Sequence, residues 1–94
     1  MILSICIPTY NRAATLPNCL NSILISKLKT NLKFEICISD NASNYNVKKI
    51  IKPFKKKLNI RLNRNKKNLG YAVNLLKTVS MAKGEFAWCI GDDD

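Results

Sequence analysis

The 94-residue sequence contains no histidine, and none of its four cysteines belongs to a C-x-x-C pair. Histidine and closely spaced cysteines are the usual ligands of structural zinc, so their absence excludes the common zinc-binding motifs. Each cysteine lies inside an apolar segment, and we expect all of them to be core thiols. They are Cys6, Cys19, Cys37 and Cys89.

Glycine and proline are also scarce, with three residues of each, whereas hydrophobic residues make up 47% of the chain. This composition excludes low-complexity disorder and is typical of a globular chain. The first apolar run, residues 2–7, ends at Pro8, which is too early for a signal-peptide core or a membrane span. We therefore expect one small cytoplasmic domain.

Acidic residues are absent between Asp40 and Glu85, although the chain carries a net charge of +10. The basic block at residues 48–67 could face a nucleotide, an anionic membrane surface or a nucleic acid, or it could be a solvated helix face. Only Tyr45 and Phe54 in this region could stack on bases, which disfavours a specific nucleic-acid partner. Peripheral contact with the inner face of a membrane stays open.

Four short apolar runs are predicted to be strands. Residues 2–7, 34–39 and 86–90 are near-continuous apolar segments, the pattern of strands buried on both faces of a parallel sheet. Residues 58–62 alternate with period two and predict an edge strand with one wet face. Pro8 is expected to end the first strand, because proline has no N–H group for a ladder.

Helical patterns separate these strands. We expect a helix over about 14–27 with Thr15 as its cap, a short basic helix over 47–51, and a third helix after Gly70. The third helix carries one apolar stripe and is expected to end at Gly84. The stripe consists of Ala72, Leu75, Leu76, Val79 and Ala82. The order β-α-β-α-β-α-β predicts a Rossmann-like α/β fold, a mostly parallel sheet of about four strands with flanking helices.

Polar residues follow the first two predicted strands at their carboxyl ends, the edge of an open α/β sheet where ligands bind. Asp40 follows the second strand and could accept hydrogen bonds from a ribose hydroxyl or a base N–H group. Alternatively, Asp40 or Ser43 forms an Asx-turn or a helix cap. Gly70 precedes the third helix, whose free N–H groups form a weak phosphate site to which Arg64 or Lys67 could add charge.

The last predicted strand leads directly into Asp92, Asp93 and Asp94. Carboxylate oxygens at the carboxyl edge of a sheet suit Mg²⁺ or Mn²⁺, and the alternative is a solvated acidic terminus. The first loop lacks G-x-G-x-x-G, which disfavours an NAD enzyme. A divalent ion on these aspartates would instead bridge diphosphate oxygens and stabilise the charge of a leaving diphosphate.

Four motifs, in this order and spacing, resemble the amino-terminal, nucleotide-sugar-binding part of family 2 glycosyltransferases with the GT-A fold. They are residues 4–12, 35–43, 68–70 and 82–94. The resemblance implies a nucleotide-sugar donor, often a uridine diphosphate sugar, and a saccharide or lipid-linked acceptor. It also implies metal-assisted transfer that inverts the anomeric centre, with the aspartate cluster as a D-x-D-type element.

The resemblance assigns roles to residues of this chain. It implies nucleotide contacts from Pro8, Thr9, Tyr10, Asn11, Arg12, Asp40, Asn41, Asn68, Gly70 and Asp92. It implies metal contacts from Asp92, Asp93 and Asp94, with Asp92 favoured toward the ribose. Three positions depart from the family pattern: Gly91 replaces a frequent first Asp, Asn41 a common second Asp, and Ala42 the usual Gly.

Family members continue into an acceptor-binding half that carries the catalytic base, so we interpret residues 1–94 as a truncated donor-binding half without that base. The alternative hypothesis is a non-catalytic basic module that binds nucleic acid or anionic membrane through residues 48–67. If the last strand lies beside the first, the truncated sheet leaves an unpaired edge and apolar surface, so self-association is expected.

Overall fold

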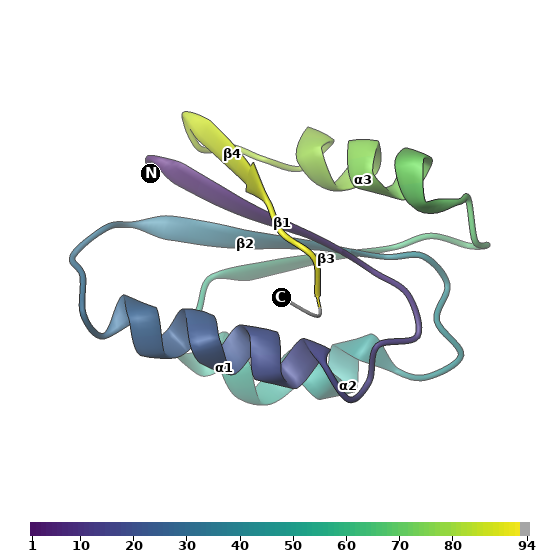
Figure 1. The fold of residues 1–94 in the computed structure, drawn as a ribbon, viewed down its shortest axis with the longest axis horizontal. Helices are drawn as coiled ribbons and strands as arrows, with labels where there is room; N and C mark the ends of the chain where they lie inside the picture. Colours follow the sequence, from purple (N-terminus) through teal and green to yellow (C-terminus); the bar gives the residue numbers. More distant parts are fainter. Residues whose placement is uncertain (93–94) are drawn as a thin grey trace.

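A computed structural model describes residues 1–92. Its elements are β1 (Leu3–Thr9), α1 (Leu16–Lys27), β2 (Phe34–Asp40), α2 (Val47–Ile51), the 3₁₀ helix η1 (Lys52–Lys56), β3 (Ile60–Arg64), α3 (Tyr71–Ser80) and β4 (Phe86–Cys89). The strands form one parallel sheet in the order β3-β2-β1-β4 (Figure 1). The predicted α/β architecture is confirmed. The last strand lies beside the first, which the sequence analysis had considered only as a condition. No helix within residues 1–92 is long and apolar enough to cross a membrane.

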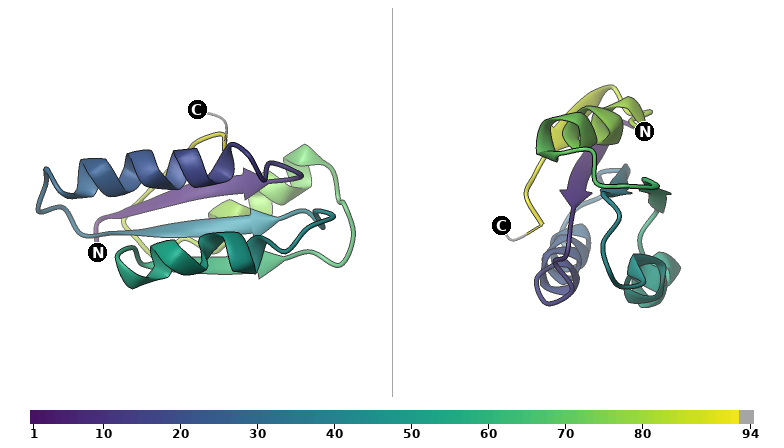
Figure 2. Two further views of the ribbon diagram at one scale, coloured as in Figure 1. Left: turned by 90° about the horizontal axis from the view of Figure 1, so that it is seen from below. Right: turned by 90° about the vertical axis from the view of Figure 1, so that its right-hand side faces the viewer.

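The hydrophobic core lies on one face of the sheet, under α1 and α2. Alternate strand residues supply it, because successive side chains of a strand point to opposite faces. Ile5 and Ile36 pack there with Leu16 and Leu20 of α1 and with Ile51 of α2. Figure 2 shows α1 and α2 on this face and α3 on the other. The short basic helix predicted at 47–51 is therefore real, and it anchors through its apolar side.

The opposite face of the sheet is polar. Glu35 is 1% exposed there, and its Oε2 accepts hydrogen bonds from Ser4 Oγ at 2.6 Å and from the Lys83 N–H at 2.7 Å. Its Oε1 lies 2.9 Å from Arg61 Nε, and Arg61 also donates to the Met81 carbonyl. These bonds tie β1, β2, β3 and the segment before β4 together.

α3 packs on this polar face with polar side chains. Its buried residues are Asn74 and Thr78. The apolar stripe is only partly covered, because Leu75 and Val79 are half-buried and Leu76 is 70% exposed. Asn74 Oδ1 accepts from Ser39 Oγ, and its Nδ2 donates to the Ser39 carbonyl. The hydroxyl and carbonyl of Ser39 thus supply the hydrogen-bond partners that the buried amide of Asn74 needs.

The prediction that Pro8 ends the first strand is wrong. β1 continues to Thr9, and Pro8 pairs with Ser39. Both N–H and C=O groups of one strand residue point to the same neighbouring strand, and the Cys6 carbonyl accepts from Ile90 on the β4 side. The nitrogen of Pro8, two residues on, therefore faces the β4 side. Pairing with β4 ends at Cys6 and Cys89, before it reaches Pro8, so β1 contains Pro8 without an interruption of its ladder to β2.

β4 is an edge strand rather than a strand buried on both faces, which corrects the prediction. Its residues are all exposed, with Phe86 at 63% and Trp88 at 57%, and Cys89 is not a core thiol. Within residues 1–92, β4 has a strand partner only on its β1 side, and helices cover mainly β1 and β2. The expectation of self-association through this edge stays a prediction.

Other predicted element ends shift or fail for local reasons. Thr15 sits at the N-cap of α1 but makes no capping hydrogen bond, and the Arg12 carbonyl instead accepts from Thr15 and Leu16. α3 ends at Ser80, so Gly84 is not its cap. Gly84 lies against β1, where its N–H donates to Ser4 Oγ at 2.8 Å. The edge strand is confirmed as β3, although it begins at Ile60.

Candidate nucleotide-binding cleft

A cleft of about 490 Å³ lies at the carboxyl ends of the strands, within the size range of small-molecule sites. Parallel strands bring their carboxyl ends to one edge, so loops far apart in the sequence meet there. The lining residues are Pro8, Thr9, Tyr10, Arg12, Asn41, Asn68, Gly70, Tyr71, Asn74, Gly91 and Asp92. Every residue predicted to bind nucleotide lines this cleft except Asn11 and Asp40.

Asp92 ties the end of the chain to the end of β1. Its Oδ2 accepts a hydrogen bond from Thr9 Oγ1 at 2.6 Å, and its Oδ1 lies 3.8 Å from Arg12 Nε. Asp92 is only 6% exposed. The carboxylate predicted at the carboxyl edge of the sheet is therefore held beside Thr9 at the end of β1, with a cationic side chain next to it.

Of the three predicted metal ligands, the structure describes only Asp92. Asp93 and Asp94 lie outside the described residues, and residues 1–92 contain no group of three side chains that could hold a metal ion. Asp92 supplies one carboxylate to the cleft, which is the kind of hard oxygen ligand that Mg²⁺ and Mn²⁺ prefer. A carboxylate of this kind suits such an ion, but it is one ligand and not a complete set.

Asp40 forms the turn that the sequence offered as its alternative role. Its Oδ1 accepts from Ser43 N at 3.0 Å and from Ser43 Oγ at 2.6 Å, and its Oδ2 lies 3.2 Å from Arg64. Asp40 is fully buried and does not line the cleft. Arg64 also donates to the Ser43 and Tyr45 carbonyls, so its charge serves this turn rather than the start of α3.

Asn11 joins the first loop to the second instead of lining the cleft. Its N–H donates to Ser43 Oγ at 2.8 Å, and its Oδ1 accepts from the Asn44 N–H at 2.9 Å. Asn11 and Ala42 both have left-handed backbone conformations, with φ of 52° and 65°. Asparagine tolerates this conformation well, whereas alanine adopts it at a cost.

The floor of the cleft is a network of asparagine amides. Asn41 Nδ2 donates to Asn68 Oδ1 at 2.8 Å and to the Gly70 carbonyl at 3.2 Å. Asn41 Oδ1 accepts from Asn65 Nδ2 at 3.0 Å and from the Leu69 N–H at 2.9 Å. Asn65 Nδ2 also donates to Asn74 Oδ1 at 2.9 Å. The network fixes the 68–70 loop against the end of β2.

Sequence reasoning missed several members of this site. Asn65, Asn74 and Tyr71 belong to none of the four motifs, and Gly91 was noted only as a departure from the family pattern. For Asn74, the one available signal was a polar residue in the middle of the apolar pattern of α3. It gains meaning only when Ser39 and Asn65 are known to lie opposite it.

Replacing Asn65 with alanine should lower the free energy of unfolding by about 2 kcal/mol, because Asn41 and Asn74 each lose a buried donor. Urea unfolding would measure this loss. Amide hydrogen exchange should also become faster at Leu69, whose N–H bonds to Asn41. The matched control is Asn31→Ala at an exposed position, and equal stability losses in the two variants would contradict the prediction.

Comparison with known proteins gives the cleft its context. The family model described as "Glycosyl transferase family 2" matches residues 4–94. The chain belongs to glycosyl transferase family 2. The resemblance deduced from the motifs is thereby confirmed, and the cleft stands at the strand ends of a family 2 glycosyltransferase chain.

Two relatives are informative. The chain is 45% identical to the abequosyltransferase RfbV of Salmonella typhimurium, covering 100% of this chain and 28% of RfbV. The crystal structure of Staphylococcus aureus TarS residues 1–349 superposes with a TM-score of 0.87 at 26% identity, covering 100% of this chain and 28% of TarS. TarS has also been solved with UDP and with UDP-GlcNAc. The chain thus spans little more than a quarter of either relative.

Proposed function

We propose that this chain is the donor-binding half of a glycosyltransferase and that its cleft takes the nucleotide of a nucleoside-diphosphate sugar, with uridine favoured. The observation that carries the proposal is the Asp92 carboxylate, held 2.6 Å from Thr9 Oγ1 inside a cleft at the strand ends. Family membership supports it, and so do the complexes of TarS with UDP and UDP-GlcNAc.

The lining residues suit the parts of such a ligand. Arg12 is exposed beside Asp92 and can offer a cation to a diphosphate. Gly70, with φ of 86°, leaves the start of α3 open to a phosphate oxygen, since a methyl group added there meets no atom within 4 Å. A direct contact of Asp40 with ribose or base would require its bonds to Ser43 and Arg64 to open.

Asp92, together with Asp93 or Asp94, would hold Mg²⁺ or Mn²⁺ in this proposal. The ion would neutralise the diphosphate as it leaves. Transfer to a saccharide or lipid-linked acceptor, with inversion, would belong to the whole protein. The described residues supply donor contacts, and none of them is assigned the role of catalytic base.

Calorimetry with UDP and GDP, in Mn²⁺ and in chelator, tests the proposal. We expect UDP to bind more tightly in Mn²⁺, and Asp92→Asn to weaken that binding by about ten-fold or more, because a charged ligand is lost. Glu85→Gln, at an exposed acidic residue outside the cleft, is the matched control. A folded sample that binds neither nucleotide would refute the proposal, and binding indifferent to chelator would refute its metal.

A further inference from the structure

We propose that the outer face of α2 and η1 is a docking surface for an anionic lipid bilayer. This surface, the lysine face, consists of Lys48, Lys49, Lys52, Lys55, Lys56 and Lys57, all exposed. It lies outside the cleft and uses none of its lining residues. The inference therefore does not depend on the function proposed for the cleft.

The packing of α2 and η1 forces these lysines outward. Val47, Ile51 and Leu58 are buried in the core at 1%, 0% and 3% exposure, and Ile50 and Phe54 pack partly against it. All the lysines between them consequently point away from the sheet. The segment is amphipathic, with its apolar side already used by the core, so the free side can interact only through charge.

Within residues 1–92, no carboxylate forms an ion pair with the lysine face. The ion pairs of residues 1–92 all use arginine: Arg12 with Asp92, Arg61 with Glu35 and Arg64 with Asp40. Residues 41–84 contain no Asp or Glu at all. An ordinary solvated helix carries both signs, because pairs of opposite charge stabilise it and neighbouring like charges destabilise it. A surface of one sign in this density indicates an anionic partner.

The residue types favour a bilayer over a nucleic acid. Lysine is a compact, hydrated point charge, which suits diffuse attraction to headgroups, whereas arginine is the residue of bidentate phosphate recognition. No aromatic side chain on the lysine face is available for base stacking. Phe54 packs against the core, and the Tyr45 hydroxyl accepts a hydrogen bond from the Arg12 N–H.

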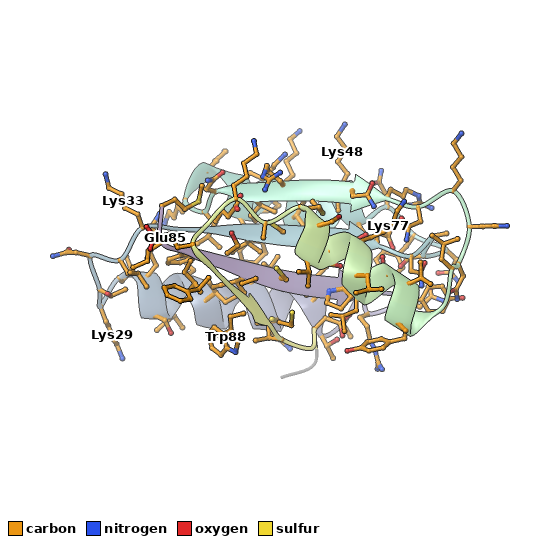
Figure 3. The ribbon with its side chains drawn as sticks, turned by 90° about the horizontal axis from the view of Figure 1, so that it is seen from above. Lys29, Lys33, Lys48, Lys77, Glu85 and Trp88 are labelled. Atoms are coloured by element: carbon orange, nitrogen blue, oxygen red, sulfur yellow. The ribbon has the colours of Figure 1, made fainter. Side chains whose placement is uncertain are left out.

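The chain provides its own control surface. In Figure 3, Lys48 projects beyond the β3 side of the sheet, on the opposite side from Trp88, whereas Lys29 and Lys33 lie at another end of the molecule. Lys29, Lys33 and Lys83 are all exposed and none belongs to the lysine face, so neutralising them removes the same charge from outside that face. Local docking and general attraction by net charge can therefore be separated.

The experiment is co-sedimentation with phosphatidylcholine vesicles that contain either no anionic lipid or about one third phosphatidylglycerol. The unchanged chain should bind the anionic vesicles only. The triple variant Lys48→Gln/Lys49→Gln/Lys52→Gln should bind about 100-fold more weakly, at about five-fold for each lysine, and the triple variant at Lys29, Lys33 and Lys83 should lose less than about five-fold. Circular dichroism verifies that both remain folded.

A second variant, Lys55→Gln/Lys56→Gln/Lys57→Gln, tests the other half of the lysine face and should lose binding to a similar extent. Equal losses in the lysine-face and control variants would overturn the proposal, because net charge alone would then explain binding. Absence of binding to anionic vesicles would overturn it as well. So would a single-stranded oligonucleotide that binds more tightly than the vesicles and displaces them, since the partner would then be nucleic acid.

Discussion

Replacing Glu35 with glutamine is expected to lower the free energy of unfolding at neutral pH by about 3 kcal/mol. The carboxylate accepts from Ser4 and from the Lys83 N–H and pairs with Arg61 while being 1% exposed. Burial alone would raise the pKa of Glu35. The hydrogen bonds from Ser4 and Lys83 and the bond and charge of Arg61 outweigh it, and they lower the pKa from 4.5 to about 2.

The same shift predicts how stability depends on pH. Because the folded state holds Glu35 ionised to a lower pH than the unfolded state does, its contribution is fully present above the unfolded pKa of 4.5. It is lost as the pH falls from 4.5 towards about 2, where the folded protein also takes up the proton. Glu35→Gln should remove this part of the acid dependence.

Urea unfolding at a series of pH values between neutral and acidic measures both effects. Glu85→Gln is the matched control, because Glu85 is the exposed glutamate of the chain and its replacement should change stability by less than about 0.5 kcal/mol. A Glu35→Gln variant as stable as the Glu85→Gln variant, with an unchanged acid limb, would show that the Glu35 network does not hold the sheet.

Gly84→Ala is expected to cost about 2 kcal/mol. A methyl group on residue 84 would lie 2.9 Å from the carbonyl carbon of Leu3 and 2.9 Å from Ser4 Oγ. The nearest obstacle is backbone of the central strand β1, which cannot swing aside as a flexible side chain can. The segment before β4 must therefore move away and lose the bond from the Gly84 N–H to Ser4 Oγ.

Thermal or urea unfolding of Gly84→Ala measures this cost, with Lys83→Ala at the exposed neighbouring side chain as control. Because Ser4 Oγ accepts from Gly84 and donates to Glu35, the Gly84 and Glu35 variants share a partner. Their combined effect should differ from the sum of the single effects. Strict additivity would mean that the two contacts are independent, against the geometry.

Much of this fold could be predicted from periodicity alone. Apolar runs at residues 2–7 and 34–39 identified the two central strands, and their carboxyl ends identified the edge at which the cleft lies. Periodicity could not predict which elements cover each face of a strand. The segment 86–90 has the composition of a buried strand, yet its burial depends on a neighbour that residues 1–92 do not provide.

In the site, too, the sequence indicated the elements that contribute residues but not all of the contacts between them. Asp92 and Thr9 are 83 positions apart. The family resemblance assigned both to the nucleotide site, and the structure explains their proximity, because the carboxyl ends of the neighbouring parallel strands β1 and β4 meet at one edge of the sheet. The sequence left the role of Asp40 open between a ligand contact and a turn, because a carboxylate can accept hydrogen bonds in either role. The structure shows that Ser43 and Arg64 are its partners. The hydrogen bond from Asn65 to Asn74 links a loop to a helix, and no local sequence pattern predicts such a contact.

The proline in β1 has one more effect on the chain that runs beside it. In a continuing parallel ladder, the carbonyl of Ile90 would next receive an amide hydrogen from residue 8, and a proline has none to give. The bond from Ile90 to the Cys6 carbonyl is therefore the last rung. Beyond this bond the chain no longer pairs with β1, and the Asp92 carboxylate, two residues later, accepts a hydrogen bond from the Thr9 hydroxyl at the end of β1.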